Sequence, residues 1–382
     1  MLNTPSKQAP LLEITKHFAS LKDPRVVGRT DHPLLTIIIM ALVGVICGAN
    51  GWDDLEEDAE DRQEWYARFL DMPNGVPSAD TFRRVLSALR PEAFFECVSS
   101  WVQSLAQPLE GQVVAFDGKT LRGAMKRTPW GKLHQVHVWS TKQRLLLAQI
   151  ATPGAPEETE AVRQLLALVE LKKAIATGDA AHCSAKTAQS VVDAGGNYLL
   201  HLKGNRAALH KGVEGYFRQA RSEGFGEVKV RHSKTEETGH GRREIRESWS
   251  VPATALELPG VEWPCLKSVT LIERTRVVDE KWTSERHYYL SSLPPKVRTI
   301  ASAARDHWQI ENGLHWVLDV QMGEDACAIR DEVGAQNFGT LRRVALMMVK
   351  RELTVKRGVD ARRRKASRNP KYLEQILTRG IS

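Results

Sequence analysis

Two aspartates stand where apolar segments with the character of buried strands come to an end. The run QVVAF leads into Asp117, and KAIATG leads into Asp179. A third acid, Glu311, lies in a later segment of helical character. Carboxylates brought together repel one another, and a divalent cation that prefers oxygen ligands, such as Mg²⁺ or Mn²⁺, relieves that repulsion. Two such ions can activate water or a 3′-hydroxyl and stabilise the leaving oxygen of a phosphodiester, so these acids are candidates for metal-dependent phosphodiester chemistry. Taken singly, an acid at a strand end is more often a turn or capping residue.

The order of the predicted elements brings the two aspartates together. From residue 111 onward the order is β-β-β-α-β-α-β, with strands at 112–116, 134–140, 144–151, 173–180 and 197–205 and helices at 158–170 and 184–196. In a mixed sheet of this order the first and fourth strands can lie side by side, which places Asp117 and Asp179 at one edge. A helix packed across that edge can deliver Glu311. The sequence therefore predicts an α/β fold with a mixed sheet flanked by helices.

The segments around this sheet differ in character. Residues 1–105 are predicted to form an all-helical domain, whose uncharged stretch 32–52 indicates a buried helix rather than a membrane span. Residues 106–350 form the predicted catalytic domain, interrupted by a polar, strand-like insertion at about 205–292. Residues 351–382 are predicted to be a basic tail, too polar to add much to a core.

Composition and charge narrow the class of partner. The 382 residues are 42% hydrophobic and 26% charged, which allows a sizeable core and excludes global disorder. The net charge of +8 is uneven, at −6 over 1–110, +6 over 111–349 and +8 over 350–382. This distribution indicates a polyanionic partner, with nucleic acid the leading candidate, although a basic protein without such a partner stays open. Scattered cysteines without a C-x-x-C pair, and no secretory signal, favour a reducing cytoplasm.

Several segments resemble one known family. FDGKTLRGA, TGDAAHCSAKTAQSVVDAGGNYLLHLKGN and HWQIENGLHWVLDVQMGEDACAIR are similar to the three catalytic segments of H-repeat-associated insertion-sequence transposases, of the DDE group with an RNase H-like core. DPRVVGRTDHPLL, GWDDLEEDAE and MPNGVPSADTFRRV resemble the helical domain that precedes that core. The resemblance covers roughly residues 20–350 with its motifs in the same order. It implies that Asp117, Asp179 and Glu311 are the metal-binding catalytic acids, and that a β-rich insertion separates the second from the third.

The resemblance also implies a function. A transposase of this kind binds the terminal inverted repeats of its element and catalyses metal-dependent DNA cleavage and strand transfer to target DNA with two Mg²⁺ or Mn²⁺ ions. It implies a homodimer in the synaptic complex, no nucleotide cofactor, no membrane, and a place at the nucleoid in a bacterial cytoplasm. Two alternatives stay open: a metal-dependent DNA nuclease without strand transfer, and a catalytically decayed DNA-binding transposon remnant.

Gly118-Lys119-Thr120 cannot end a nucleotide-binding loop, because Val113 stands where that loop needs a glycine.

The surroundings of Glu311 depart from the pattern of many related transposases. Those enzymes carry Tyr, Arg and Lys around the acid in the spacing Y-x2-R-x3-E-x6-K, whereas this chain has Ala304, His307 and Leu318 at those positions. His307 and His315 lie four residues on either side of Glu311, so the three share a helix face. That face is open to three interpretations: a transition-metal site, contacts to DNA phosphates, or polar packing against the sheet edge.

Basic residues flanking the predicted acidic edge are candidate contacts to the DNA backbone, with a solvated rim as the alternative. They are Lys119, Arg122, Lys203, Arg206, Arg305, His307 and His315. Trp308 and Trp316 are predicted to pack in the core. The tail from Lys350, with its run of Arg362, Arg363, Arg364 and Lys365, is expected to add nonspecific affinity for DNA or to be a disordered end.

Overall fold

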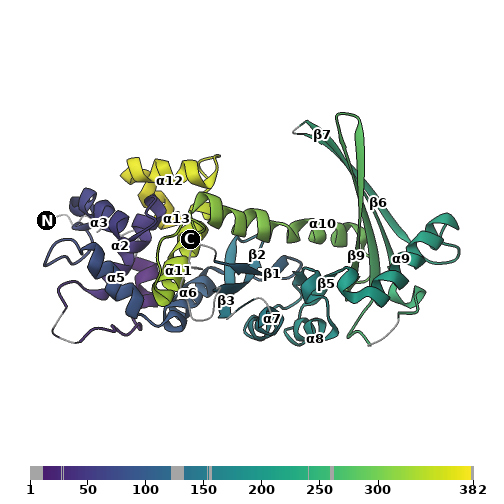
Figure 1. Ribbon diagram of the computed structural model, residues 1–382, viewed down its shortest axis with the longest axis horizontal. Helices are drawn as coiled ribbons and strands as arrows, with labels where there is room; N and C mark the ends of the chain where they lie inside the picture. Colours follow the sequence, from purple (N-terminus) through teal and green to yellow (C-terminus); the bar gives the residue numbers. More distant parts are fainter. Residues whose placement is uncertain are drawn as a thin grey trace, which may run out of the picture.

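The computed structural model describes residues 12–26, 28, 30–121, 133–152, 154, 157–239, 241–258 and 262–379. The molecule is elongated, with a helical part at one end, a sheet in the middle and a projecting β-rich part at the other end (Figure 1). Within the described residues, the N-terminal helices are α1 (Leu12–Phe18), α2 (Leu34–Cys47), α3 (Trp52–Asp61), α4 (Gln63–Tyr66), α5 (Ala79–Ala88) and α6 (Pro91–Leu105).

The uncharged stretch forms α2, which is buried by protein. Every residue from Thr36 to Ile46 in this helix is buried. The prediction of a buried core helix is therefore confirmed. In the part of the chain that the structure describes, no single helix has the length and apolar character to cross a membrane. Only α2 and α3 taken together reach that length, and the chain bends by 94° between them.

A nine-stranded mixed sheet follows, in the order β3-β2-β1-β4-β5-β9-β8-β7-β6. Its strands are β1 (Val113–Thr120), β2 (His134–Ser140), β3 (Leu145–Thr152), β4 (Ile175–Gly178), β5 (Asn197–Leu202), β6 (Arg231–Gly239), β7 (Arg242–Pro252), β8 (Ser268–Val278) and β9 (Lys281–Ser291). β1 pairs in parallel with β4, and β4 pairs in parallel with β5, while the other pairs are antiparallel. The predicted β-β-β-α-β-α-β order and the neighbouring first and fourth strands are confirmed.

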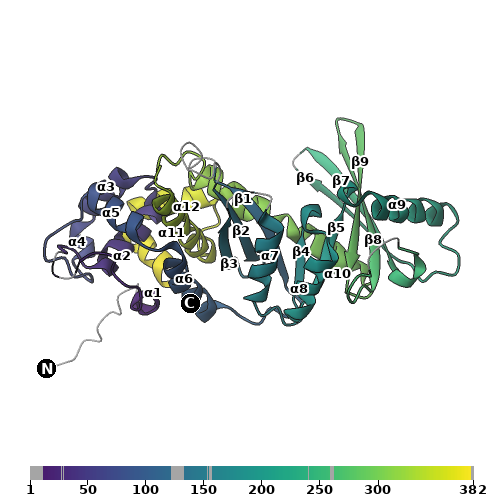
Figure 2. The same ribbon diagram turned by 60° about the horizontal axis from the view of Figure 1, so that its bottom comes forward.

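Helices cover both faces of the sheet. Successive strand residues point to opposite faces, and apolar side chains on each face pack against helices. Val114 and Phe116 pack in the same cluster as residues of α7 (Glu158–Ala167), α8 (Ala185–Asp193) and α9 (Ala207–Ser222). Val113 packs in a separate cluster with Ile300 and Ala303 of α10 (Val297–His307). The long helix α10 therefore crosses one face, and α7 and α8 lie on the opposite face (Figures 1 and 2).

The predicted insertion continues the same sheet. Leu199 of β5 lies opposite Ser291 of β9 in antiparallel register, so β6 to β9 extend the sheet without a break. β7, β8 and β9 have eleven residues each and project beyond the central sheet as a long twisted ribbon (Figure 1).

The chain beyond α10 changes helical geometry before it returns to the N-terminal helices. Two π-helical segments, η5 (Ile310–His315) and η6 (Val317–Gln321), follow α10. Helices α11 (Glu332–Arg351), α12 (Val359–Arg368) and α13 (Pro370–Arg379) come next. They lie beside the N-terminal helices in both ribbon views (Figures 1 and 2).

The prediction that the segment after residue 350 adds little to the core is wrong for the residues described. Tyr372, Leu373 and Ile376 of α13 are buried in the same hydrophobic cluster as α2 and α11. Arg362 and Arg363, expected to be exposed basic residues, are buried and donate to backbone carbonyls of Val349 and Val45, at 2.7 and 2.9 Å. Helices α12 and α13 therefore complete the helical part of the molecule.

Candidate active site

Asp117 and Asp179 lie side by side because β1 and β4 are parallel neighbours. Phe116 is paired with Gly178, so the next residue of each strand is one of the two aspartates. Paired residues of adjacent strands are about 4.8 Å apart. Burial, together with the nearby carboxylates of Asp179 and Glu158, raises the pKa of Asp117 to about 7. The edge of the sheet thus holds negative charge that is poorly compensated by the protein.

Glu311 reaches this edge from the π-helical segment η5. Burial and the Asp179 carboxylate both raise the pKa of Glu311, while Lys203 lowers it. Asp179 is therefore close enough to interact electrostatically with both Asp117 and Glu311. Single turns of π-helix inside longer helices occur frequently at functional sites.

Asp179 has a second, structural role. Its Oδ1 accepts a hydrogen bond from the backbone N–H of Ala181 at 2.9 Å, which caps the short 3₁₀ helix η2 (Ala180–His182). The side chain is 41% exposed, so one carboxylate oxygen can be fixed by the cap while the group stays open to a ligand. Capping and metal binding are therefore compatible at this residue.

A fourth acid, Glu158, lies against Asp117 and was not found from the sequence. Its two carboxylate oxygens contact Nε2 of His134 at 2.7 Å and Nε2 of His182 at 2.8 Å. Burial raises the pKa of Glu158, but the hydrogen bonds with His134 and His182 outweigh it and lower the pKa to about 2. Ligand atoms of Asp117, Glu158 and His182 all lie within 4.8 Å of one another.

Gly118 makes room for this contact. A Cβ at that position would lie 2.3 Å from Glu158 Oε2 and from His134 Nε2. In sequence, Glu158 resembles an ordinary acid in the first turn of a helix, and no local pattern sets it apart.

Asp117 also joins a buried polar network that leads to α11. Oδ2 of Asp117 is 3.6 Å from Nδ1 of His315, whose Nε2 is 3.2 Å from Nδ1 of His137. Arg343 of α11 donates from Nε to His137 at 3.0 Å and lies 3.2 Å from Glu324. Glu324 in turn pairs with Lys119 at 2.9 Å, and Lys119 also pairs with Asp319. The network ties the candidate acids to the helical part of the protein.

Three of the predicted DNA contacts are buried and bonded within the protein. Lys119 is 6% exposed and holds interior carboxylates. His307 is buried, with Nδ1 3.1 Å from Oγ1 of Thr177, and His315 is buried beside His137. Burial lowers the pKa of His307 to about 4 and that of His315 to about 3, so neither is a cation available to phosphate. In place of contacts to DNA, the structure shows packing contacts within the protein.

The remaining predicted DNA contacts differ in accessibility. Lys203 and Arg206 are exposed, and Arg206 donates to the carbonyl of Cys183 at 3.0 Å. Arg305 is 54% exposed and pairs with Glu237. Arg122 lies outside the described residues. Lys203, Arg206 and Arg305 thus stay candidates for contact with DNA.

The other departures around Glu311 are explained by packing. Ala304 and Leu318, which stand at the Tyr and Lys positions of the related signature, are buried. The two tryptophans on this segment do not pack in the core as predicted: Trp308 is 39% exposed and Trp316 is 51% exposed. The thiol of Cys183 is buried, which raises its pKa to about 12 and removes it as a nucleophile.

The donor set fits a divalent cation with a preference for oxygen. Asp117, Asp179 and Glu311 supply carboxylates, and the raised pKa of Asp117 reflects charge that a cation would neutralise. The alternative of a transition-metal site built on His307 and His315 has little geometric support, because each ring is bonded within the protein. Among the described residues, the ligand atoms close enough to share one ion belong to Asp117, Glu158 and His182, so this group includes Asp117 but neither Asp179 nor Glu311.

Comparison with known proteins gives the class to which this fold and site belong. Residues 108–348 match the family described as "Transposase DDE domain", and residues 15–102 match "DDE_Tnp_1-associated". The chain therefore belongs to the DDE-domain transposase family, whose catalytic domain has an RNase H-like fold. The predicted fold class is confirmed.

Individual relatives of similar length are also putative transposases. The chain is 32% identical over 376 residues to "H repeat-associated putative transposase YhhI" of Escherichia coli (strain K12), covering 96% of this chain and 98% of the relative. It is 33% identical over 367 residues to "Putative transposase YncI" of Escherichia coli O157:H7, covering 94% of this chain and 93% of the relative. The resemblance drawn from the catalytic segments is confirmed.

Proposed function

We propose that this protein binds the terminal inverted repeats of its own element, cleaves DNA there with a divalent cation, and joins the freed ends to target DNA. The observation that carries this proposal is the parallel pairing of β1 with β4, which sets Asp117 beside Asp179 within reach of Glu311. Membership of the family supports the same class of chemistry.

Asp117, Asp179 and Glu311 would hold two Mg²⁺ or Mn²⁺ ions. When bound, such ions supply nucleophile activation and stabilise charge on the leaving oxygen. The chain contributes the placement of its acids: the N–H of Ala181 orients Asp179, and Glu158 with His134 and His182 supports the side of Asp117.

The reaction has two chemically similar steps. In the first, a water oxygen bonds to the phosphorus at the element end, the bond from phosphorus to the 3′-oxygen breaks, and that oxygen takes up a proton. In the second, the freed 3′-hydroxyl loses its proton and bonds to a target phosphorus, while the target's own 3′-oxygen leaves and takes up a proton. Each step exchanges one phosphorus–oxygen bond for another, so nucleotide hydrolysis and a covalent protein intermediate are unnecessary.

We propose a division of labour along the chain that follows the family matches. Residues 1–105 form a helical domain, residues 106–350 carry the chemistry, and the described helices beyond residue 350 complete the helical part. Lys203 and Arg206 are exposed and flank the end of β5, and Lys203 lowers the pKa of Glu311, so both are placed to meet a phosphate near the acids. A homodimer would bring two element ends together.

The test uses purified full-length protein, a labelled duplex that carries the element's end, and Mg²⁺ or Mn²⁺. We expect nicked and strand-transferred products that disappear with EDTA and in the Glu311→Gln variant. Glu223→Gln, which alters an exposed acid at the end of α9, should keep both products. Nicking without joining would favour a nuclease, and binding without either product would favour a decayed DNA-binding remnant.

A further inference from the structure

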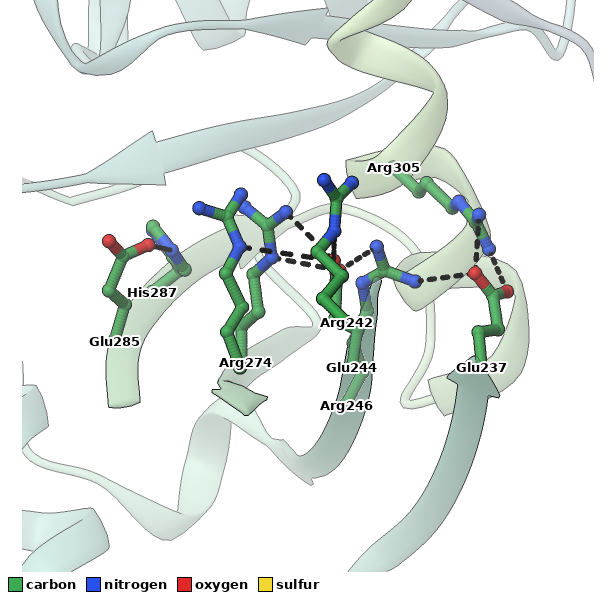
Figure 3. Close-up of polar contacts among 9 residues, drawn as sticks. Glu237, Arg242, Glu244, Arg246, Arg274, Glu285, His287 and Arg305 are labelled. Atoms are coloured by element: carbon green, nitrogen blue, oxygen red, sulfur yellow. Dashed lines mark hydrogen bonds and ion pairs between the residues drawn. The ribbon is translucent and has the colours of Figure 1, made fainter. Parts of the chain in front are cut away.

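One face of the projecting ribbon is lined by arginines. Strand register places Arg246 opposite Arg274, and Glu244 opposite Arg276, so these side chains share a face, as does Arg242 two residues before Glu244. Figure 3 shows the guanidinium groups of β7 and β8 converging around Glu244, with Arg305 of α10 bonded to Glu237 beside them. Helix α10 contacts β6, β7 and β8, which closes one side of this face.

The positive charge of this face exceeds what its own acids neutralise. It comprises Arg242, Arg246, Arg274, Arg276 and Arg305, hereafter the arginine face. These five arginines stand against three glutamates in the same group, Glu237, Glu244 and Glu285, which leaves a net charge of +2. His287 adds no charge at neutral pH, because burial lowers its pKa.

The arginines fall into two groups by their contacts. Arg246 and Arg274 are 21% and 25% exposed and hydrogen-bond to Glu244, so they neutralise a buried carboxylate. Arg242 and Arg276 are 46% and 40% exposed, and their Nε atoms lie 3.7 and 3.9 Å from Glu244, beyond hydrogen-bond distance. The second pair therefore has donors available to a ligand.

The arginine face opens into the same groove as the third acid. A cavity of about 740 Å³ is lined by Arg242, Arg274, Arg276, Trp308 and Glu311, among other residues. Asp306 of α10 and Glu285 of β9 also line it, so most of the arginines are on the ribbon, whereas acids line both sides of the cavity. A ligand bound to the ribbon could therefore extend through this cavity to Glu311 in the candidate active site.

We propose that the arginine face holds the sugar-phosphate backbone of the DNA whose reacting phosphate lies at Glu311. This inference rests on the proposed function. Guanidinium groups bind phosphate through two parallel hydrogen bonds, and the face contains arginine and no lysine. Arg242 and Arg246 are four residues apart in one strand, about 13 Å, and each strand of a DNA duplex presents about four phosphates over that length of the helix axis.

The opposite face of the ribbon supplies a matched control. Arg243 follows Arg242 directly and points the other way, where it pairs with Glu236. Arg286 of β9 pairs with Glu273 on that same face. A double change at Arg243 and Arg286 removes the same charge from the same ribbon, on β7 and β9, without altering the arginine face.

The experiment compares Arg242→Gln/Arg276→Gln with Arg243→Gln/Arg286→Gln. Binding of a fluorescein-labelled DNA duplex of mixed sequence is measured by anisotropy in EDTA over a range of salt concentrations, with thermal melts of both variants. We expect the first variant to bind about tenfold more weakly at low salt, with a salt slope smaller by about 1.8, since each lost phosphate contact removes about 0.9. The control should bind within about twofold of wild type. Both should melt normally, because Arg246 and Arg274 still hold Glu244.

Equal affinity and equal salt slope in a folded first variant would overturn the proposal. Unchanged DNA binding together with a shift from dimer to monomer in size-exclusion chromatography would also overturn it, because the face would then join two copies of the chain. The proposed function fails separately: it fails if wild-type protein binds DNA but never cleaves the element end in Mg²⁺ or Mn²⁺. The binding assay contains no metal, so its result does not depend on that outcome.

Discussion

Nδ1 of His315 lies 3.6 Å from Oδ2 of Asp117, so the first candidate acid is in contact with the π-helical segment that carries the third. The same histidine bonds to His137, and His137 accepts from the fully buried Arg343 of α11. The acid edge is thus anchored to the helical part of the molecule as well as to the sheet. Such outer contacts orient metal ligands and commonly affect metal affinity.

Asp117→Asn is expected to stabilise the metal-free protein. Burial, assisted by Asp179, raises the pKa of Asp117 from 3.8 to about 7, so the folded state holds this proton more tightly than the unfolded chain does. The stability of the metal-free protein therefore falls as the pH rises from about 4 to 7, by a contribution on the order of 4 kcal/mol. Asparagine stays neutral and avoids this cost.

Thermal melts at pH 8 test the expectation for Asp117. In EDTA the variant should melt above wild type, and added Mg²⁺ should raise the melting temperature of wild type but not of the variant. A variant that melts below wild type in EDTA would show that this carboxylate is not repelled by its surroundings.

Glu158→Gln should weaken metal binding by about tenfold. The amide can accept from one histidine only, so either His134 or His182 loses its partner and the support beside Asp117 loosens. Glu160→Gln on the same helix is the control, since Glu160 is 57% exposed and pairs only with nearby Arg163 among the described ion pairs. Mn²⁺ titration followed by electron paramagnetic resonance measures the affinities, and equal values for the two variants would refute a supporting role for Glu158.

Glu324→Gln should lower the free energy of unfolding by about 3–5 kcal/mol, because Arg343 would remain buried without its counter-charge and Lys119 would keep only Asp319. Burial raises the pKa of Glu324, but Arg343 and Lys119 outweigh it and lower the pKa from 4.5 to about 2. Its contribution to stability is therefore present above about pH 4.5 and is lost as the pH falls toward 2. Urea unfolding is the measurement, with Asp360→Asn at an exposed ion pair as the control; a loss no larger than the control's would contradict the network.

Arg363→Ala should destabilise the protein by about 2–3 kcal/mol, whereas Arg364→Ala should have little effect. Arg363 is buried and donates to the carbonyl of Val45 in α2, while the side chain of Arg364 is 62% exposed. Chemical denaturation of both variants gives the comparison. If the two substitutions cost the same, α12 does not hold α2 as the structure indicates.

Much of the sheet and its two aspartates could be predicted from the sequence because the signals are local. Apolar runs that end in an acid mark β1 and β4, and the β-β-β-α-β order makes those strands neighbours. Glu158 could not be found in this way, since its role depends on Gly118 and on histidines distant in sequence that only the fold brings to it.

The helix that carries Glu311 shows where periodicity is insufficient. The spacing groups His307 with His315 and Trp308 with Trp316, but it does not say which stripe faces the sheet. The histidines face the interior because Thr177, His137 and Asp117 offer them polar partners, and the tryptophans are left exposed. The burial of Arg362 and Arg363 could not be predicted from composition. These arginines are buried because they donate hydrogen bonds to free carbonyls at helix ends.

The central claim is that Asp117 binds the metal used in catalysis, and a metal-specificity switch tests it most directly. Asp117→Cys is assayed for cleavage of the element end in Mg²⁺ and in Mn²⁺, beside wild type and Asp117→Ala. A thiolate is a poor ligand for Mg²⁺ and a better one for softer ions. We expect Asp117→Cys to be inactive in Mg²⁺ and partly active in Mn²⁺, with Asp117→Ala inactive in both. Full activity of Asp117→Ala in Mg²⁺ would contradict the account.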